Sequence, residues 1–309
     1  MDYKSAQLKY MTDIHMSDAS LCEEIWKTSL YEPLRERLTQ SLQAQTCKEK
    51  FVYIGCGPLA PIIEEGTQCF REISKFDQIV LVDISETYLL QAKSRLDQIF
   101  SDKTISYYVY DITNGLSEVF YKLITSLLHG GKSTFIDRVG YLKENFEQII
   151  NRIAPDQVAP PVSDASYIYS ELVATYTGIP ALFDCEHMLT AYGVDVKPLM
   201  ERIFPFWQAY NERVYSYHVS NLSEMISVSG VVSVATDIEK IYLKDDINNV
   251  GSFSDINFPM TFDIEGLKVK DFDKETMWDD SGSHKYDQSA HINTSAHLHR
   301  IGSYTYEKF

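Results

Sequence analysis

The sequence predicts an α/β protein built on a mostly parallel β-sheet with helices on both faces. Short apolar runs typical of strands occupy residues 51–55, 78–85 and 105–113. Between the second and third runs, residues 89–100 carry apolar side chains at helical spacing. Strands that alternate with helices favour a parallel sheet, because each helix returns the chain to the start of the next strand.

The composition favours a globular protein and disfavours two kinds of partner. The chain has 309 residues, of which 44% are hydrophobic, enough for one large domain with insertions or for two ordinary domains. Its 28 basic and 44 acidic residues give a formal net charge of 28 − 44 = −16. This charge repels phosphate backbones and anionic lipid head groups, so we expect neither nucleic acid nor a membrane as a partner.

Cysteine usage and the first residues favour a reduced, cytoplasmic protein. The five cysteines are odd in number and lack Cys-x-x-Cys spacing. The N-terminal residues contain no apolar signal core, and no apolar run approaches the roughly eighteen residues that a membrane span needs. The four histidines between residues 284 and 299 match no metal-site spacing that we know, so we expect no metal.

The predicted organisation is a helical cover over residues 1–50 and a main domain over residues 51–309. The segment Ser20-Leu21-Cys22-Glu23 fits a capping box that opens a helix with leucines at four-residue spacing. Less regular helical segments predict insertions at about residues 114–163 and 179–220.

The second half of the chain predicts further strands and one long helix. Residues 165–178 favour a fourth strand, and apolar residues at helical spacing follow between residues 199 and 217. Residues 222–243 predict the end of a helix, a tight turn at Ser229-Gly230 and a fifth strand. Residues 299–309 alternate as antiparallel strands do.

The stretch Gly55-Cys56-Gly57-Pro58 follows the first predicted strand and is typical of a ligand-binding turn. Gly55 and Gly57 lack the Cβ atom that would hold a ligand away from the backbone. Pro58 suits the first position of a helix, and a helix beginning there would offer unpaired N–H groups to an anion. With Ala60 the stretch fits the dinucleotide pattern GxGxx(G/A), which alone is a weak signal.

Two aspartates at the ends of the next predicted strands strengthen this interpretation. Asp83 ends the second strand, where a carboxylate can accept hydrogen bonds from both ribose hydroxyls of NAD or of an adenosyl ligand. Asp111 ends the third strand, where it could face an adenine amino group. A helix-capping role is equally plausible for Asp111.

At this point the chain resembles the class I S-adenosylmethionine-dependent methyltransferases. The segments that carry the resemblance, within residues 50–113 and 164–240, are VYIGCGPLAP, LVDIS, YDIT, YIYSELVATYTG and LSEMISVSGVVSVATD. The resemblance implies a Rossmann-like seven-stranded sheet with a reversed last strand, and S-adenosyl-L-methionine (SAM) as cofactor. We expect the N-terminal and inserted helices to form a lid over the strand ends.

The resemblance assigns the methionine part of SAM to Gly55 and Gly57, the ribose to Asp83 and the adenine to Asp111. The adjoining residues of the same turns complete the expected cofactor site: Cys56, Pro58, Ile84, Ser85 and Ile112. The chain departs from the family in two places. Val228-Ser229-Gly230 stands where Pro-Gly-Gly is usual, and Tyr53 or Ile54 replaces an acidic residue before the glycine turn.

The acceptor of the methyl group is expected at the end of the fourth strand. Glu171, Tyr176 and His187, with Asp184 nearby, are the candidates to hold an acceptor or move a proton. Each has an ordinary alternative: Tyr176 suits a core or pocket wall, and His187 suits a helix start. We expect N- or O-methylation of a small neutral or cationic molecule, with a homodimer possible because dimers are common in this class.

Three alternative functions stay open on sequence alone. The first is an NAD-dependent oxidoreductase, which the helical N-terminal segment and the separate acid at the third strand disfavour. The second is aminocarboxypropyl transfer from SAM, because GCGPLAP resembles the glycine turn of nicotianamine synthase-like enzymes. The third is a noncatalytic scaffold or binding subunit with the SAM fold.

Overall fold

The computed structural model describes residues 32–58, 60–126, 144, 159–171, 197–242, 267–279 and 297–308. The helices are α3 (Glu32–Ala44), α4 (Gln68–Ile73), α5 (Glu86–Ile99), α6 (Leu116–Ser126) and α10 (Lys197–Met225). The strands are β1 (Lys50–Ile54), β2 (Gln78–Asp83), β3 (Thr104–Val109), β4 (Ala165–Glu171), β5 (Ile226–Tyr242), β6 (Leu267–Asp279) and β7 (His297–Lys308). The predicted capping box at Ser20–Glu23 lies outside the described residues.

The chain divides into two compact units. One comprises residues 1–17, 111–159 and 174–219, and includes α6 and most of α10. The other comprises residues 18–110, 160–173 and 220–309, and includes the sheet. The predicted division into a cover over residues 1–50 and a main domain over residues 51–309 stays a prediction, as does the helical lid.

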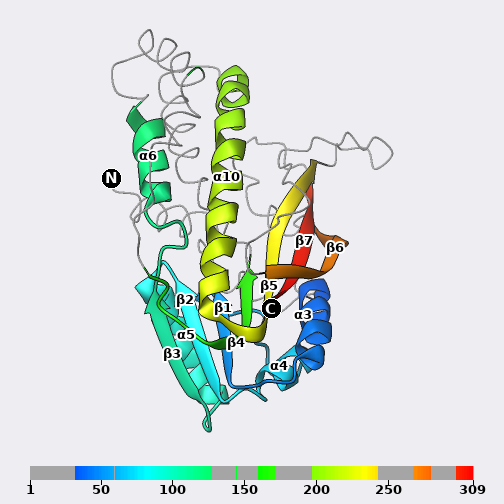
Figure 1. Ribbon diagram of the computed structural model, residues 1–309. Coiled ribbons are helices and arrows are strands. Elements are labelled where there is room, and N and C mark those ends of the chain that lie inside the picture. The colour runs from blue at the N-terminus through cyan, green and yellow to red at the C-terminus, as the bar shows by residue number, and fades with distance from the viewer. Residues whose placement is uncertain are drawn as a thin grey trace, which may run out of the picture. The chain divides into compact units, whose positions relative to one another are not determined.

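All seven described strands form one sheet in the order β3-β2-β1-β4-β5-β7-β6 (Figure 1). The four pairs from β3 across to β5 are parallel, whereas β7 runs antiparallel to both β5 and β6. The sheet confirms the predicted Rossmann-like α/β fold with seven strands, and the reversed strand is the last one in the chain. The order reverses at β1, because β2 lies on one side of it and β4 on the other.

The central strands form because long apolar side chains can be buried on both faces of a parallel sheet. Residues 51–54 of β1 are at most 1% exposed, and every residue of β4 is buried. Phe51 stacks on Tyr167 of the neighbouring strand with ring centroids 5.9 Å apart, and Phe76 lies 5.5 Å from Phe51. By contrast β3 is one of the two edge strands of the described sheet, and its last two residues are exposed.

The helices beside the sheet follow their apolar spacing. Leu34, Leu38 and Leu42 of α3 recur every four residues and are buried on one face of the helix. The predicted stripe in residues 89–100 lies in α5, which contacts β2 and β3. Ser85 caps α5, since its Oγ accepts a hydrogen bond from the Tyr88 N–H at 3.3 Å.

The prediction of a helix beginning at Pro58 is wrong. Residues 60–67 form turns, and α4 begins only at Gln68, where the Thr67 hydroxyl accepts a hydrogen bond from the Phe70 N–H at 3.1 Å. Ala60 has φ of 45°, a left-handed conformation that a continuing right-handed helix excludes. The expected row of free helix N–H groups at the glycine turn is therefore absent from this described segment.

The expected tight turn at Ser229-Gly230 falls inside the bounds of β5, where the chain is not regularly extended. Ser229 has φ of 62°, and the pairing with β4 shifts between Ala165 and Tyr167. Two steps along β4 face five steps along β5, from Ile226 to Val231, and a Cβ on Gly230 would touch the Ile226 side chain, so the chain turns back on itself here, as expected. Gly230 fits here because a Cβ atom would lie 2.9 Å from the Ala165 carbonyl oxygen and 2.6 Å from Ile226 Cγ1.

We expect Gly230→Ala to destabilise the protein. The Ala165 oxygen belongs to the backbone of a central strand and cannot move without disturbing its pairing, so the new methyl group overpacks this segment. Urea denaturation should show a free energy of unfolding lower by at least about 1 kcal/mol. The wild type is the reference, because Gly66, the open alternative, has φ of 89° and would itself be strained as alanine. A stability of Gly230→Ala equal to that of the wild type would contradict the close approach at Gly230.

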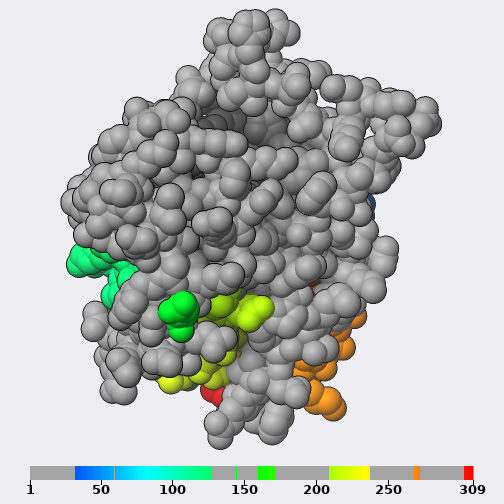
Figure 2. All heavy atoms as spheres, turned by 90° about the horizontal axis from the view of Figure 1, so that it is seen from above, coloured from blue at the N-terminus to red at the C-terminus, as the bar shows by residue number. Residues whose placement is uncertain are grey.

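The exposed sides of the described elements carry many polar residues, together with single exposed apolar residues such as Leu90, Val228 and Val269. On α6, Lys122 pairs with Glu118 at 2.6 Å, and atoms of this helix are visible at the surface in Figure 2. Residues 268–271 of β6 are exposed and appear in orange in the same view. Among the described residues, no helix has the length and apolar character needed to cross a membrane.

Candidate functional site

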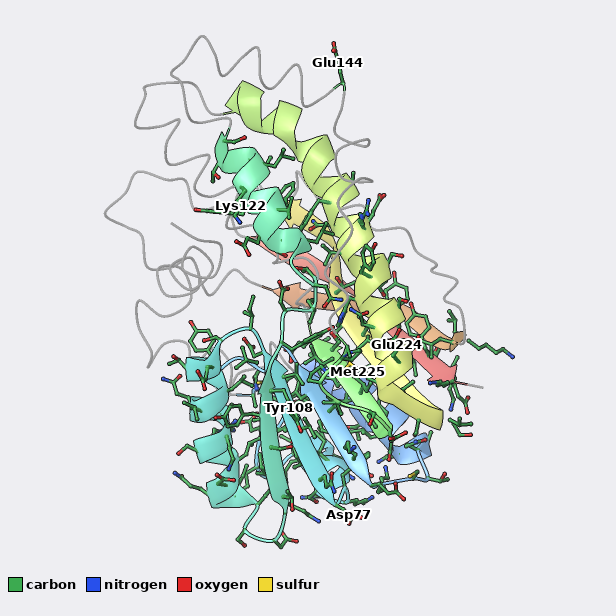
Figure 3. All side chains as sticks on the ribbon, turned by 60° about the vertical axis from the view of Figure 1, so that its left-hand side comes forward. Asp77, Tyr108, Lys122, Glu144, Glu224 and Met225 are labelled. Carbon is green, nitrogen blue, oxygen red and sulfur yellow. The ribbon has the colours of Figure 1, made fainter. Side chains whose placement is uncertain are left out.

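The candidate site lies at the carboxyl end of β1, where the strand order of the sheet reverses. In parallel α/β sheets, ligands bind outside the carboxyl ends of the strands at such a reversal. Asp77, labelled in Figure 3, precedes β2 and marks the opposite, amino end of the strands. The predicted turn at residues 55–58 follows β1 directly, so the fold places it at the position where a ligand is expected.

The two glycines of the turn have left-handed backbones. Gly55 has φ of 75° and Gly57 has φ of 54°, values that side chains with a Cβ rarely adopt. The Gly55 N–H continues the sheet by donating to the Val82 carbonyl oxygen at 2.8 Å. A Cβ built on Gly57 meets nothing within 4 Å, so open space lies beside this backbone. The turn therefore has both the conformation and the room for a ligand to approach closely.

Asp83, the last residue of β2, fastens the turn to the neighbouring strand. Its Oδ2 accepts a hydrogen bond from the Gly57 N–H at 3.1 Å, and its Oδ1 accepts one from the Ser85 N–H at 3.0 Å. Burial raises the pKa of this carboxyl, and the hydrogen bonds from the Ser85, Gly57 and Ile84 N–H groups oppose the rise. Each carboxylate oxygen can accept more than one hydrogen bond, so capacity for ligand hydroxyls is left.

Glu171 lies on the other side of the turn. Because Ile54 pairs with Val82 on β2 and with Ser170 on β4, the next residue along each outer strand is an acid, Asp83 or Glu171. Two strand spacings separate their backbones, about 10 Å. Glu171 is 5% exposed, and its Oε2 accepts a hydrogen bond from the Tyr53 hydroxyl. Two carboxylates thus flank the end of β1.

The thiol of Cys56 is not placed for nucleophilic chemistry. Cys56 is fully buried, and burial raises its pKa well above the usual range of a thiol. The negative charges of Asp83 and Glu171 raise this pKa further. A thiol with a raised pKa stays protonated at neutral pH and reacts slowly, so Cys56 belongs to the turn through its backbone.

The carboxylate of Asp111 is used locally. Its Oδ1 accepts hydrogen bonds from the Thr113 N–H at 2.9 Å and from the Thr113 hydroxyl at 2.7 Å. Its Oδ2 accepts one from the Gly115 N–H at 3.1 Å. These bonds fix the turn before α6, but the helix-cap role is taken by Thr113, whose hydroxyl accepts a hydrogen bond from the Ser117 N–H at 3.1 Å. Contact of Asp111 with adenine stays a prediction.

The other predicted site residues divide into two groups. Pro58 and Ile112 are buried, and Ile84 and Ser85 are partly buried, each beside one of the turns already described. Tyr176, Asp184 and His187 lie outside the described residues. Their roles toward an acceptor stay predictions, and Glu171 is the one proposed acceptor residue that the structure describes.

Sequence reasoning missed three features of the site. Tyr53 was noticed only as the residue that replaces an acid, although its hydroxyl reaches Glu171 on the next strand. Its position four residues before Gly57 at a strand end was the available signal. The hydrogen bond from Gly57 to Asp83 depends on the register of β1 and β2 and has no local signature. The third feature is the attachment of the following loop to Arg35 and Arg95.

No protein-family model matches this chain, and a search of curated proteins found no match. Solved structures similar to it include several SAM-dependent methyltransferases. One is a SAM-dependent methyltransferase from Mesorhizobium loti, with a TM-score of 0.42 and 9% identity over 92% of this chain and 100% of that chain. The activity in the name of each similar structure is that of the named protein.

Two further structures illustrate the range of these similar proteins. The N-methyltransferase NodS from Bradyrhizobium japonicum WM9, in complex with S-adenosyl-L-homocysteine (SAH), aligns with a TM-score of 0.38 and 10% identity over 99% of this chain and 97% of that chain. The [4+2]-cyclase SpnF aligns with a TM-score of 0.43 and 9% identity over 98% and 96% of the two chains. The reaction of this chain must be argued from its own residues.

Proposed function

We propose that the chain is a SAM-dependent methyltransferase that acts on a small molecule. The observation that carries the proposal is the glycine turn itself: a left-handed Gly57 with open space beside it, bonded to the acid that ends the next strand. Such a turn suits a ligand that combines a compact charged part with an adenosyl group. The overall acidity and the carboxylate of Glu171 favour a neutral or cationic acceptor.

The residues at the strand ends fit the parts of SAM. The open side of Gly57 suits the methionine portion, which is too bulky to approach a backbone that carries a Cβ. Asp83 can accept hydrogen bonds from ribose hydroxyls while it holds the turn. SAM bound there would supply an electrophilic methyl group for an acceptor nitrogen or oxygen, with SAH as the product left at the turn.

Glu171 is the residue that we assign to the acceptor. It is the last residue of β4 and follows Ser170, the last position that pairs with β1, and the Tyr53 hydroxyl donates a hydrogen bond that fixes its carboxylate. An ionised carboxylate can hold a cationic amine in place or take the proton that the nucleophile loses. Methyl transfer gains most from alignment of the two reacting groups, so a fixed carboxylate suits the reaction. Tyr176 and His187 are the next candidates.

The deciding experiment is calorimetry of the purified protein with SAH, SAM and NAD side by side. We expect SAH to bind with a dissociation constant in the micromolar range, about −8 kcal/mol, and NAD to bind much more weakly. Equal or tighter binding of NAD would overturn the proposal in favour of an oxidoreductase. Mass spectrometry of products would separate methyl transfer from aminocarboxypropyl transfer, and tight SAH binding without turnover would favour a scaffold.

Gly57→Ala tests whether the open space holds the ligand. The methyl group should occupy part of that space and lower SAH affinity roughly tenfold, with a backbone strain of about 1 kcal/mol. Gly57→Val would add β-branching at positive φ and confuse the two effects. Gly66→Ala is the matched control, since Gly66 has φ of 89° and equally open surroundings. Unchanged SAH affinity in Gly57→Ala with a stability loss equal to the control would exclude a ligand at Gly57.

A further inference from the structure

The loop that follows the glycine turn is buried although it is not helical. Residues 60–63 are buried, and the described backbone hydrogen bonds of the segment, such as that from the Ile63 N–H to the Ala60 carbonyl oxygen at 2.9 Å, include none to the carbonyl oxygens of Pro61 and Ile63. Buried backbone carbonyl groups need hydrogen-bond partners, because a buried carbonyl has lost its hydrogen bonds to water and costs free energy if no protein group replaces them. Something other than secondary structure must therefore hold residues 60–67, which we name the clamped loop.

Arg35 of α3 is the first partner of the clamped loop. Its Nε and Nη2 both donate to the Pro61 carbonyl oxygen, at 3.3 and 2.8 Å, and its Nη2 pairs with Glu64 Oε2 at 2.6 Å. The Arg35 side chain is 4% exposed, and the Glu64 side chain is 26% exposed. A planar guanidinium group that binds a carbonyl oxygen and a carboxylate together fixes both the position and the orientation of the loop that carries them.

Arg95 of α5 is the second partner. Its Nη2 donates to the Ile63 carbonyl oxygen at 3.1 Å, and its Nη1 lies 3.5 Å from the Ala60 carbonyl oxygen. Ala60 has φ of 45°, a conformation that persists in a residue with a side chain only where its surroundings enforce it. Its own N–H donates to the Cys56 carbonyl oxygen at 2.9 Å. A shift of Ala60 therefore moves the carbonyl next to Gly57.

From these contacts we infer that Arg35 and Arg95 are positioning residues for the cofactor turn. The two arginines, 60 positions apart in the chain, hold the clamped loop from two different helices. The loop in turn holds the glycine turn through the hydrogen bond between Ala60 and Cys56. Neither guanidinium needs to touch the ligand. The inference rests on the proposed function, because the turn is taken to bind the methionine portion of SAM.

Hydrogen exchange of the ligand-free protein tests the clamp without any cofactor. Arg95→Met keeps the length of the side chain and removes the donors. We expect the amides of residues 60–67 to exchange about tenfold faster, while amides of β1 and β4 exchange as before. Arg95→Lys keeps one donor group, so we expect its exchange rates in residues 60–67 to lie between those of the wild type and those of Arg95→Met. Arg71→Met is the control, since Arg71 of α4 is exposed and bonds only Gln68 among the described contacts.

Calorimetry with SAH then tests positioning. We expect Arg95→Met to bind SAH roughly tenfold more weakly, with Arg71→Met unchanged. Arg35→Met leaves Glu64 without its guanidinium, so the double variant Arg35→Met/Glu64→Gln is measured as well and should show the same loosened loop. If the wild type does not bind SAH, the proposed function fails while the exchange data still decide the clamp.

Three results would overturn the inference. If the amides of residues 60–67 exchange at the wild-type rate in both Arg95→Met and the double variant, the two arginines do not hold the loop. Faster exchange spread evenly over the sheet would show that the arginines only stabilise the fold. A loosened loop combined with unchanged SAH affinity would show that the loop does not position the turn.

Discussion

Replacing Asp83 with alanine should lower SAH affinity tenfold to a hundredfold. The carboxylate is expected to accept the ribose hydroxyls, and hydrogen bonds to charged groups contribute about 1.5 to 3 kcal/mol. The structure adds a second reason, because Asp83 also binds the Gly57 N–H and so keeps the turn in place. Calorimetry with SAH measures the sum of the two effects. Unchanged affinity with a lower melting temperature would make Asp83 a structural link alone.

Adenosine and 2′-deoxyadenosine separate the two roles of Asp83. If the carboxylate contacts the ribose, the wild type should bind adenosine more tightly, and Asp83→Ala should lose this preference. If Asp83 acts only through Gly57, the preference should survive while both affinities fall. Asp97→Ala is the charge-matched control, because Asp97 is exposed on α5 and pairs with Lys93 at the surface. This control should leave both nucleoside affinities unchanged.

The sequence could predict the sheet because its strands follow from local patterns. Residues 51–54 are apolar without interruption, as a strand buried on both faces must be, and a turn with two glycines ends the run. The fold around residues 60–67 could not be predicted in this way, since Pro58 suits both the start of a helix and a turn. The choice between them depends on Arg35 and Arg95, which come from distant parts of the chain.

The candidate site was only partly accessible to sequence reasoning. Asp83 was found because a strand end is visible as the end of an apolar run, but its bond to Gly57 depends on strand register. At Gly230 the pattern predicted a turn, and the chain does turn there within the bounds of β5, but the close approach of the Ala165 carbonyl oxygen has no signal in the sequence. Residues that act through long-range contacts form no recognisable pattern in the sequence, so only the folded structure identifies them.

The last prediction concerns Glu171. Glu171→Gln keeps the size of the side chain and an oxygen that can accept the Tyr53 hydroxyl, but it removes the negative charge. We expect this variant to keep SAH affinity within about threefold, or roughly 0.7 kcal/mol, because the charge serves the acceptor and not the cofactor. Methyl transfer from isotopically labelled SAM into a small-molecule pool should fall by about a hundredfold, the scale of a lost general base.

Tyr53→Phe provides the matched comparison for Glu171→Gln. It removes the hydroxyl that fixes Glu171 while the ring keeps its contact with Tyr169, whose centroid lies 5.5 Å away. The carboxylate keeps its charge and loses only its orientation, so methyl transfer should fall less than in Glu171→Gln. A collapse of SAH binding in Glu171→Gln would instead place Glu171 in the cofactor site. If neither binding nor transfer changes, Glu171 has no part in the reaction, and Tyr176 and His187 become the residues to replace.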